Sequence, residues 1–468
     1  MNFKKYFIHS LATCSIVLLS CQASIVDMPQ SPDSPKETNV AKSTTKKTEP
    51  LNFDAKTLLT EDLTITPPTP DEYQQLKQSE LTDKYNAFGL KLFKRIVAKD
   101  PHQNVSISPL SLMMALSLLY NAAAGETREE IARVLEVTDL ELQEYNALTN
   151  ILWRALSFES EELKVQLANS LWGHLSQDFS DTYLNNLQNY YQARLTRLNF
   201  LDLDASAKRI NDWISERTQG LINNILSPAS LVDAKFVLVN TLYFNGQWIS
   251  PFSITNTYEE TFQGTLSNTE VNMMHNPESS GSYFQTAEAE YLLSQFKTLD
   301  NESETTERSA FEMLFILPAP EKTVEDILEP LNIDGLSAID KQLPAIKSGS
   351  IIAPRFSEGY TNAEISDHLR GLGFENTFSS AANFSNMGTN SQVDAPEVLH
   401  STQVNMYERG VEAAATTIII GRLPNTDVYP SFFRFEADRP FIYLIRHRET
   451  GLILFCGTIK NLEKQDIK

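Results

Sequence analysis

Apolar residues recur at helical spacing in the first half of the chain and alternate as in strands in the second half. Helices are predicted at 81–98, 111–124, 128–135, 139–157, 181–191 and 205–224. Strands are predicted at 165–172, 235–243, 311–317, 350–356, 403–407, 432–435, 441–446 and 452–459. Because helices come first and strands follow, the pattern favours an α+β fold over alternating βαβ units.

Two glycine-containing segments are interpreted as chain reversals. Asn245-Gly246 follows an apolar run and precedes Trp248, which is typical of a tight hairpin turn. Gly371 and Gly373 follow a helical stretch rather than a strand. They therefore favour a helix C-cap over a dinucleotide-binding turn.

The first 20 residues are predicted to be an export signal, because two lysines precede a mostly apolar stretch too short to span a membrane. The stretch ends in the letters LLSC, which resemble a bacterial lipobox. We expect lipid on Cys21 to hold an exported protein at the bacterial cell envelope, with the outer membrane favoured. The alternative is a nearby cleavage that releases a freely secreted protein.

Residues 21–78 are predicted to form a disordered, lipid-anchored tether. Seven prolines lie there, and large hydrophobic residues are too sparse to offset the entropy of ordering. Residues 79–468 have a globular pattern without a second linker, which predicts one domain. The formal net charge of −21 argues against binding nucleic acid through its phosphates.

The sequence contains no motif for a metal or a cofactor, and we expect neither. No two of its seven histidines lie four residues apart, and neither a G-x-S-x-G elbow nor a phosphate loop occurs. Cys456 lies in an apolar run and is interpreted as a buried small hydrophobic residue. Ser108 and His400 could form a catalytic pair, but nothing around either resembles an oxyanion hole. The chain is therefore not expected to be an enzyme.

The segment 410–420, with the letters GVEAAATTIII, joins a run of small residues to a β-prone tail, and a loop-like stretch follows it. As a strand it would place Glu412 on one face. The opposite face, which has no charge, would carry Val411, Ala413, Ala415, Thr417 and Ile419. This composition indicates either a loop that can become a strand or an alanine-rich helix followed by an edge strand.

Several motifs together resemble the serpin family over residues 80–462. They are NVSISPLS at 104–111, LANSLW at 167–172, INDW at 210–213, VNTLYFNGQW at 239–248, RPF at 439–441 and LFCG at 454–457. The segment ERGVEAAA at 408–415 resembles the serpin hinge. The resemblance implies one large α+β domain with three sheets, eight or nine helices and an exposed reactive loop at about 408–439.

The resemblance also implies a mechanism. A protease cleaves the loop and is held as an acyl-enzyme, while the freed hinge enters the main sheet as a new central strand. Insertion of about 15 residues at ~3.3 Å each would carry the protease some 50 Å. A strand entering a closed sheet must slide over the core, so small uncharged residues are needed at its leading end.

The resemblance assigns roles to individual residues. The hinge comprises Glu408, Gly410, Val411, Glu412, Ala413, Ala414 and Ala415. Val411 stands where the family favours Thr or Ser. A buried hydrogen-bond cluster called the shutter comprises Ser108, Ser111, Asn240 and His400. Glu408 is expected to pair with Arg355, and Trp248 to mark the place where the sheet first opens.

The scissile bond is less well defined by the sequence. Counting from Gly410 by the family spacing puts the cut after Pro424, which is unfavourable because proline restricts the backbone on both sides. The bond Arg422–Leu423 is favoured, since an arginine before the cut suits trypsin-like proteases. The alternative is Asn425–Thr426.

The leading interpretation is a monomeric, irreversible inhibitor that traps serine or cysteine endopeptidases, with a trypsin-like target. The alternative is a non-inhibitory serpin that acts as a surface binding protein. A third class, a solute-binding lipoprotein, fits only the N-terminus. The run of alanines at 413–415 favours inhibition, because non-inhibitory members commonly carry charged or bulky residues there.

Overall fold

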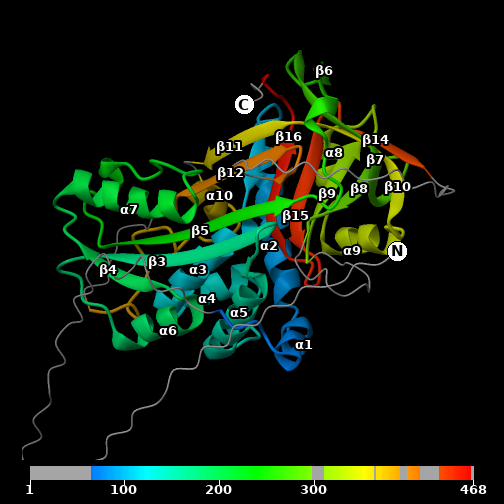
Figure 1. Cartoon of the computed structure of the whole chain (residues 1–468). Helices are drawn as coiled ribbons and strands as arrows, with labels where there is room; N and C mark the ends of the chain where they lie inside the picture. The colour runs from blue at the N-terminus through cyan, green and yellow to red at the C-terminus, as the bar shows by residue number, and fades with distance from the viewer. Residues whose placement is uncertain (1–64, 298–309, 363–364, 390–397, 412–431, 465–468) are drawn as a thin grey trace, which may run out of the picture. The chain divides into compact units, whose positions relative to one another are not determined.

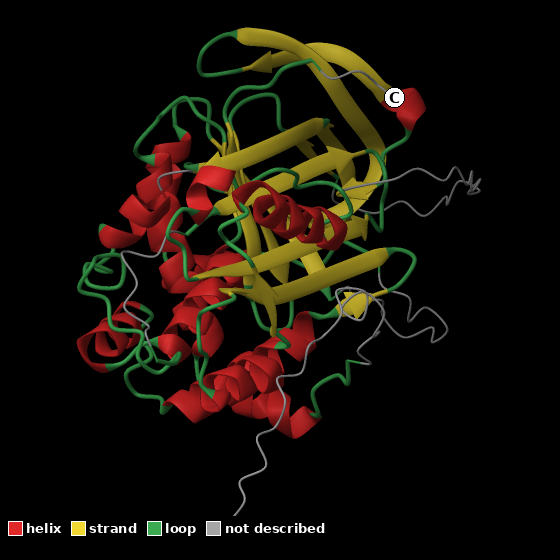
Figure 2. Ribbon diagram, turned by 90° about the vertical axis from the view of Figure 1, so that its left-hand side faces the viewer, coloured by secondary structure: helices red, strands yellow, loops and turns green. Residues whose placement is uncertain are grey.

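The computed structural model describes residues 65–297, 310–362, 365–389, 398–411 and 432–464. These residues lie in one compact unit, Thr60–Lys468. Helices pack beside and over two extended sheets (Figures 1 and 2). The described part of the chain is therefore a single α+β domain, as the sequence predicts.

Helices dominate the first half of the described chain. Their bounds are α1 Pro70–Gln78, α2 Leu81–Val97, α3 Pro109–Ala122, α4 Gly125–Val134, α5 Leu142–Leu156, α6 Asp181–Tyr191, α7 Leu203–Arg217, α8 Val324–Leu328, α9 Ile333–Gln342 and α10 Ile365–Arg370. In α3, thirteen of the fourteen residues are buried. The Ser108 side chain caps α3 by accepting the Ser111 N–H, and Pro109 occupies its first turn. This cap sets a serine pair directly beneath the seven-stranded sheet.

The seven-stranded sheet has the order β11-β12-β13-β5-β3-β2, with β4 paired to β3. Its strands are β2 Phe158–Glu159, β3 Leu163–His174, β4 Arg194–Leu198, β5 Phe236–Gln247, β11 Phe356–Asn362, β12 His400–Tyr407 and β13 Gly410–Val411. Helix α7 lies across this sheet (Figure 1). Trp172 of β3 meets Trp213 of α7 edge to face, with ring centroids 6.1 Å apart.

The nine-stranded sheet has the order β1-β16-β15-β9-β8-β7-β10-β14, with β6 paired to β7. Its strands are β1 Val105–Ile107, β6 Thr257–Gln263, β7 Asn268–Gln285, β8 Ala289–Gln295, β9 Phe311–Pro318, β10 Lys347–Pro354, β14 Phe433–Glu436, β15 Phe441–His447 and β16 Ile453–Ile459. Every residue of β9, β15 and β16 is buried. The long strand β7 pairs with β6 and β10 along its first part and with β8 along its last, which joins two of the expected sheets into one.

The prediction of a hairpin turn at Asn245-Gly246 is wrong, because β5 continues through both residues to Gln247. The glycine is needed for close packing rather than for a turn. A Cβ on Gly246 would lie 2.7 Å from the Phe296 ring and 3.1 Å from Leu163. Glycine inside a strand commonly marks such a close approach. By contrast, the predicted helix C-cap is confirmed, since α10 ends at Arg370 and Gly373 has a φ of +111°.

The predicted tether extends too far, because α1 occupies its last nine residues, Pro70–Gln78. A capping box starts this helix: Thr69 accepts the Glu72 N–H, and Glu72 accepts the Thr69 N–H. Leu76 is fully buried, and Arg154 of α5 pairs with the Glu72 carboxylate. This contact lowers the Glu72 pKa to about 2. Residues before 65 lie outside the described part of the chain.

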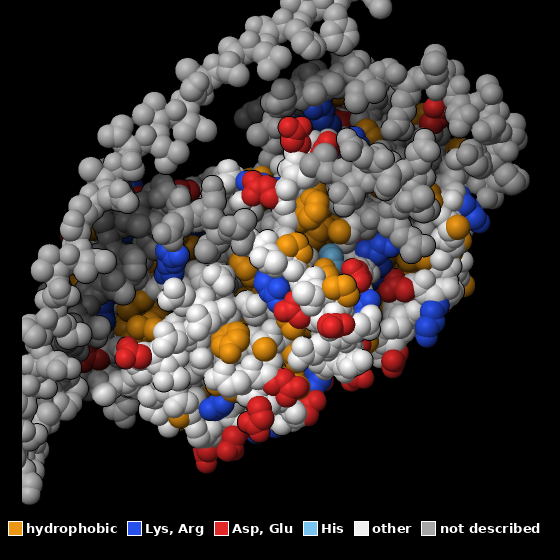
Figure 3. Space-filling view, turned by 60° about the horizontal axis from the view of Figure 1, so that its bottom comes forward, with side chains coloured by type: hydrophobic (Ala, Val, Ile, Leu, Met, Phe, Trp, Pro, Cys, Tyr) orange, Lys and Arg blue, Asp and Glu red, His pale blue; other side chains and the backbone are white. Residues whose placement is uncertain are grey.

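Charges are interspersed on the face shown in Figure 3, where acidic side chains (red) lie among basic ones (blue). No helix within the described ranges is long and apolar enough to cross a membrane. Cys456 is fully buried in β16, as its apolar neighbours predict, and burial raises its thiol pKa well above the usual range.

Candidate functional site

The candidate site is a slot in the seven-stranded sheet between β5 and β12. At the end of the slot near Met406 and Gly246, which we call its upper end, the two-residue strand β13 lies between β5 and β12. Val411 pairs there with Met406 of β12 and with Gly246 of β5. Below this point, no β5–β12 ladder occurs among the described residues. The first five residues of β5, 236–240, are only half-buried. Strands β5 and β12 are therefore separated along most of the length of β5, while β5 stays paired with β3.

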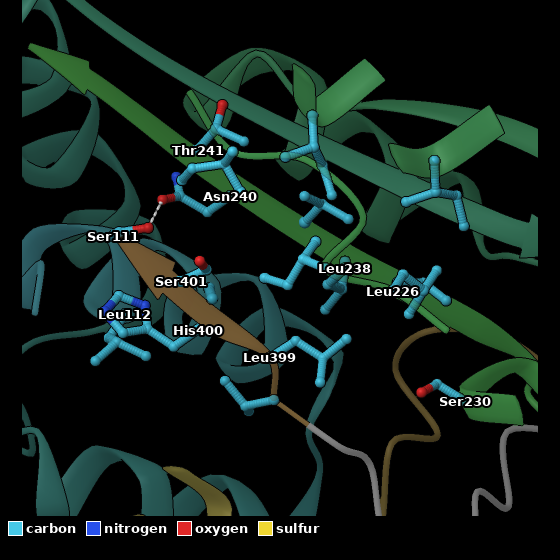
Figure 4. Close-up of a pocket in the computed structure, with 18 of the residues that line it drawn as sticks. Ser111, Leu112, Leu226, Ser230, Leu238, Asn240, Thr241, Leu399, His400 and Ser401 are labelled. Carbon is cyan, nitrogen blue, oxygen red and sulfur yellow. Dashed lines mark hydrogen bonds between the residues drawn. The ribbon is translucent and has the colours of Figure 1, made fainter. Parts of the chain in front are cut away.

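The slot encloses a cavity of about 790 Å³. Its walls are the facing edges of β5 and β12, the underlying helix α3, and α7 with the chain that connects it to β5. Figure 4 shows Leu238 and Asn240 of β5 across from Leu399 and His400. The opening therefore reaches from the outer face of the sheet down to the serine pair at the start of α3.

The four predicted shutter residues lie together beneath the slot. The Ser111 hydroxyl donates to the Asn240 side-chain oxygen, and the Ser111 N–H donates to the Ser108 hydroxyl oxygen at 3.1 Å. The Ser108 N–H donates to the His400 Nε2 at 3.2 Å. This cluster joins α3 to β5 on one side and to β12 on the other.

His400 is held in its neutral form. It is 4 % exposed, and burial lowers its pKa to about 4. Because Nε2 accepts the Ser108 N–H, the single ring proton of the neutral form is on Nδ1. The Ser108 hydroxyl donates to the Leu454 carbonyl at 2.8 Å and not to the imidazole. The arrangement is that of a structural cluster rather than an activated nucleophile.

Sequence reasoning missed Asn169 of β3, which extends the cluster sideways. Its side-chain oxygen accepts from the Asn240 amide at 2.8 Å, and its own amide donates to the Tyr191 carbonyl at 2.9 Å. The Tyr191 hydroxyl donates to the Asn146 side-chain oxygen at 2.6 Å. The signal was available, since Asn169 lies within the LANSLW motif, but its partners are distant in sequence.

The predicted pair of Glu408 and Arg355 is present at the upper end of the slot. Their charged atoms are 3.3 Å apart, and the side chains are 9 % and 11 % exposed. The Thr257 hydroxyl donates to the other Glu408 oxygen at 2.9 Å. The Arg355 guanidinium also lies 4.8 Å from the centre of the Tyr407 ring. These contacts fix the turn between β12 and β13.

Trp248 closes the upper end from the side of β5. Its ring stacks on Phe296 with centroids 4.5 Å apart and planes 16° apart. Its backbone N–H donates to the Arg409 carbonyl at 2.7 Å, and its indole N–H donates to the Tyr407 carbonyl at 3.4 Å. The residue therefore holds the turn that leads into β13, at the place where the resemblance predicts that the sheet opens.

The remaining predicted residues lie outside the described part of the chain. These are Cys21, Glu412, Ala413, Ala414, Ala415, Arg422, Leu423, Asn425 and Thr426. Of the hinge, Glu408, Gly410 and Val411 are described, and the last two are buried in β13. A Cβ on Gly410 would lie 1.9 Å from the Gly246 carbonyl oxygen. Only glycine therefore fits at the entrance to the slot.

The described residues contain no group of His, Cys, Asp and Glu side chains arranged to hold a metal ion. The buried polar side chains of the slot include the hydroxyls, amide and neutral imidazole of the shutter, which bond to one another, and the Thr241 hydroxyl, which is buried without a hydrogen-bond partner among the described residues. The charged lining residues Asp233 and Lys235 are exposed. The hydrogen bonds of this cluster connect β5 and β12 through the start of α3.

Comparisons with known proteins agree with this geometry. The family model described as "Serpin (serine protease inhibitor)" matches residues 83–462. Human Serpin B8 is 30% identical over 388 residues, covering 81% of this chain and 98% of that protein. An uncharacterized serpin-like protein of Thermococcus kodakarensis is 28% identical over 397 residues, covering 83% and 88%.

Solved structures show the same fold. Human glycosylated kallistatin matches with a TM-score of 0.72 at 23% identity, covering 84% of this chain and all of that one. Tengpin, a thermophilic serpin in its native state, matches with a TM-score of 0.70 at 24% identity, covering 85% and 96%. A family-model match over most of the chain, together with a relative at 30% identity, places this chain in the serpin family.

Proposed function

We propose that this serpin is an irreversible inhibitor of serine or cysteine endopeptidases, with a trypsin-like target, and that it works by inserting its cleaved loop into the slot. The observation that carries the proposal is β13: two hinge residues already occupy the top of a slot that is open below them. Serpins are typically protease inhibitors, and the alternative here is a non-inhibitory member that binds a partner at the surface.

The ladder of β13 predicts the register of the inserted strand. Val411 faces Met406 and Gly246, so continued antiparallel pairing places residue 413 opposite Val404 and Phe244. Residue 415 then faces Thr402 and Leu242. All four of these partners are buried. Because paired residues share a face of a sheet, Ala413 and Ala415 would point into the core, as the alternation in the sequence predicts.

The same register brings Thr417 between His400 and Asn240, the two shutter residues on opposite strands. A threonine hydroxyl can both donate and accept there. Continued along β5, pairing ends with residue 421 opposite Phe236, the first residue of that strand. The slot thus accommodates the chain up to the residue before Arg422. Twelve residues from Gly410 at ~3.3 Å each would carry a protease attached at Arg422 about 40 Å.

A direct test is to incubate the protein with trypsin-like and elastase-like proteases. We expect a complex that survives SDS electrophoresis with a trypsin-like enzyme, and a C-terminal fragment that begins at Leu423. A C-terminal fragment that begins at Thr426 would instead favour cleavage of the Asn425–Thr426 bond. Cleavage by every protease without any stable complex would instead support the non-inhibitory alternative.

The buried face of the insert offers a sharper test. Ala413→Arg puts a charge on the face that enters the core, which costs several kcal/mol, so this variant should be cleaved without trapping the protease. Glu412→Arg is the matched control, because residue 412 lies on the opposite face and already carries a charge. Equal trapping by both variants would refute the proposed register.

For location, we propose that lipid on Cys21 holds the protein at a bacterial cell envelope. The support is the lipobox-like LLSC sequence after an apolar stretch. Metabolic labelling with a palmitate analogue should tag the full chain but not a Cys21→Ala variant. Labelling of both would refute this assignment.

A further inference from the structure

A second cavity, of about 230 Å³, lies behind Trp248 at the upper end of the slot and is separate from the slot itself. Apolar walls come from Trp248, Phe252, Phe315 and Met406. Serines 250, 279, 280 and 294 and the Gln295 side chain provide the polar part of the lining. No charged residue belongs to the lining, all of which lies within the described residues.

We propose that this cavity, which we call the breach cavity, binds a small neutral ligand with one or two fused rings and a hydroxyl group. Its size supports this class of ligand, because a cavity of roughly 150 Å³ is enough for benzene. The absence of charged lining residues argues against an ionic ligand, which would lose its hydration without gaining a counter-ion.

The hydroxyl would be recognised by Ser250 and Ser280. Their Oγ atoms are 2.7 Å apart and share one hydrogen bond. Two serine hydroxyls together carry two donors and several acceptor positions, so the pair can still donate to and accept from a ligand. The ring would then lie against the Trp248, Phe252 and Met406 side chains.

Occupation of the breach cavity would regulate loop insertion, and this step rests on the proposed function. Three of the apolar wall residues, Trp248, Phe252 and Met406, belong to the segments that hold the hinge. Trp248 and Phe252 donate backbone N–H groups to the carbonyls of Arg409 and Glu408, each at 2.7 Å. Met406 pairs with Val411. A ligand packed on all three side chains would resist any movement of these segments that accompanies insertion below β13, and such a difference in ligand affinity between the two states is what regulation requires.

Calorimetric titration with 2-naphthol would test binding. Naphthalene would test the contribution of the hydroxyl, and 6-hydroxy-2-naphthoate would test the selectivity for neutral ligands. We expect 2-naphthol to bind at least about tenfold more tightly than either analogue. Absence of 2-naphthol binding, or equal binding of the carboxylate, would overturn the proposal.

Variants would locate the ligand. Ser280→Leu and, independently, Ser294→Leu fill the breach cavity and should each weaken 2-naphthol binding at least about tenfold. Asn268→Leu is the matched control, since Asn268 is exposed on the same strand as Ser280 but outside the cavity lining. Thermal melting identifies a variant that fails to fold, and the other variant then decides. Binding that persists in every folded cavity-filling variant would refute the site.

Complex formation with a trypsin-like protease, with and without 2-naphthol, would test regulation. We expect the ligand to raise the ratio of cleaved inhibitor to trapped protease in the wild type and in Asn268→Leu, but not in the filled variants. An unchanged ratio despite binding would overturn the regulatory step alone. If no protease is trapped under any condition, the proposed function fails, while the binding result still decides the site.

Discussion

Acidification should destabilise the shutter through His400, and the size of the effect follows from its burial. Burial lowers the pKa of His400 to about 4, against an ordinary value of about 6.5 in an unfolded chain. Between these values the unfolded state binds more protons than the folded state. Stability is therefore fully present above about pH 6.5 and is lost as the pH falls towards 4. A difference of about 2.5 units corresponds to roughly 3 kcal/mol.

The variant His400→Gln isolates this contribution. A glutamine side-chain oxygen can accept the Ser108 N–H that Nε2 accepts now, but it does not titrate. Unfolding by denaturant should be measured from pH 7.5 to 4 for both proteins. The wild type should lose roughly 3 kcal/mol more than the variant over this range.

A second buried histidine provides the control. His447 is 3 % exposed, and burial also lowers its pKa to about 4, but it lies in β15, outside the slot. His447→Gln should flatten the pH dependence of unfolding to a similar degree, because the same burial penalty is removed. If His400→Gln retains the full pH dependence of the wild type, His400 is not buried in its neutral form as described.

Three further predictions concern neighbouring contacts. Glu408→Gln leaves the Arg355 charge without its partner and should lower the free energy of unfolding by about 2 kcal/mol. In a double-mutant cycle, adding Arg355→Met should restore part of this loss, and additive effects would contradict an interaction between the two side chains. Asn169→Leu removes the link between Asn240 and Tyr191 and should cost about 1–3 kcal/mol, as measured by denaturant unfolding. Gln166→Leu on the same strand should change stability by less than about 0.5 kcal/mol. Equal effects of the two variants would argue against the link. Gly246→Ala forces a methyl group against the Phe296 ring and should lower the melting temperature, whereas Gly335→Ala in α9 should not. An unchanged melting temperature for Gly246→Ala would show that the core adapts at no cost.

Much of the fold was predictable because its local signals are strong. The helix at Asp181–Tyr191 matches its prediction at both ends, since Ser180 provides a clear N-cap. The strands β6, β7 and β8 were not predicted. Strands β6 and β7 have long polar stretches with several exposed residues, and β7 also contains a proline and a glycine. Strand β8 is short and has no exposed residue, so it lacks a clear alternation. Their pairing depends on neighbours, which no local pattern reveals.

The site was predictable to the extent that its residues lie in recognisable motifs. The pairing of Glu408 with Arg355, and the shutter cluster, were both predicted from such motifs and are present. Asn169 and Thr257 were missed because the residues that they contact are distant in sequence. The turn at Asn245-Gly246 was mistaken because the same dipeptide can serve a tight turn or leave room inside a strand for neighbouring side chains, here those of Phe296 and Leu163, and only packing distinguishes the two.

The two paired residues of β13 have a consequence for the timing of insertion. Starting a new strand is the costly step, because several backbone dihedrals must be fixed before the first ladder bonds form. Here that nucleus exists before any cleavage, since Gly410 and Val411 already have partners on both sides. Under the proposed function, insertion would be a zippering reaction in which each residue is added to a formed end. It would compete with hydrolysis of the acyl bond, so residues near the nucleus would determine whether the protein acts as an inhibitor or as a substrate.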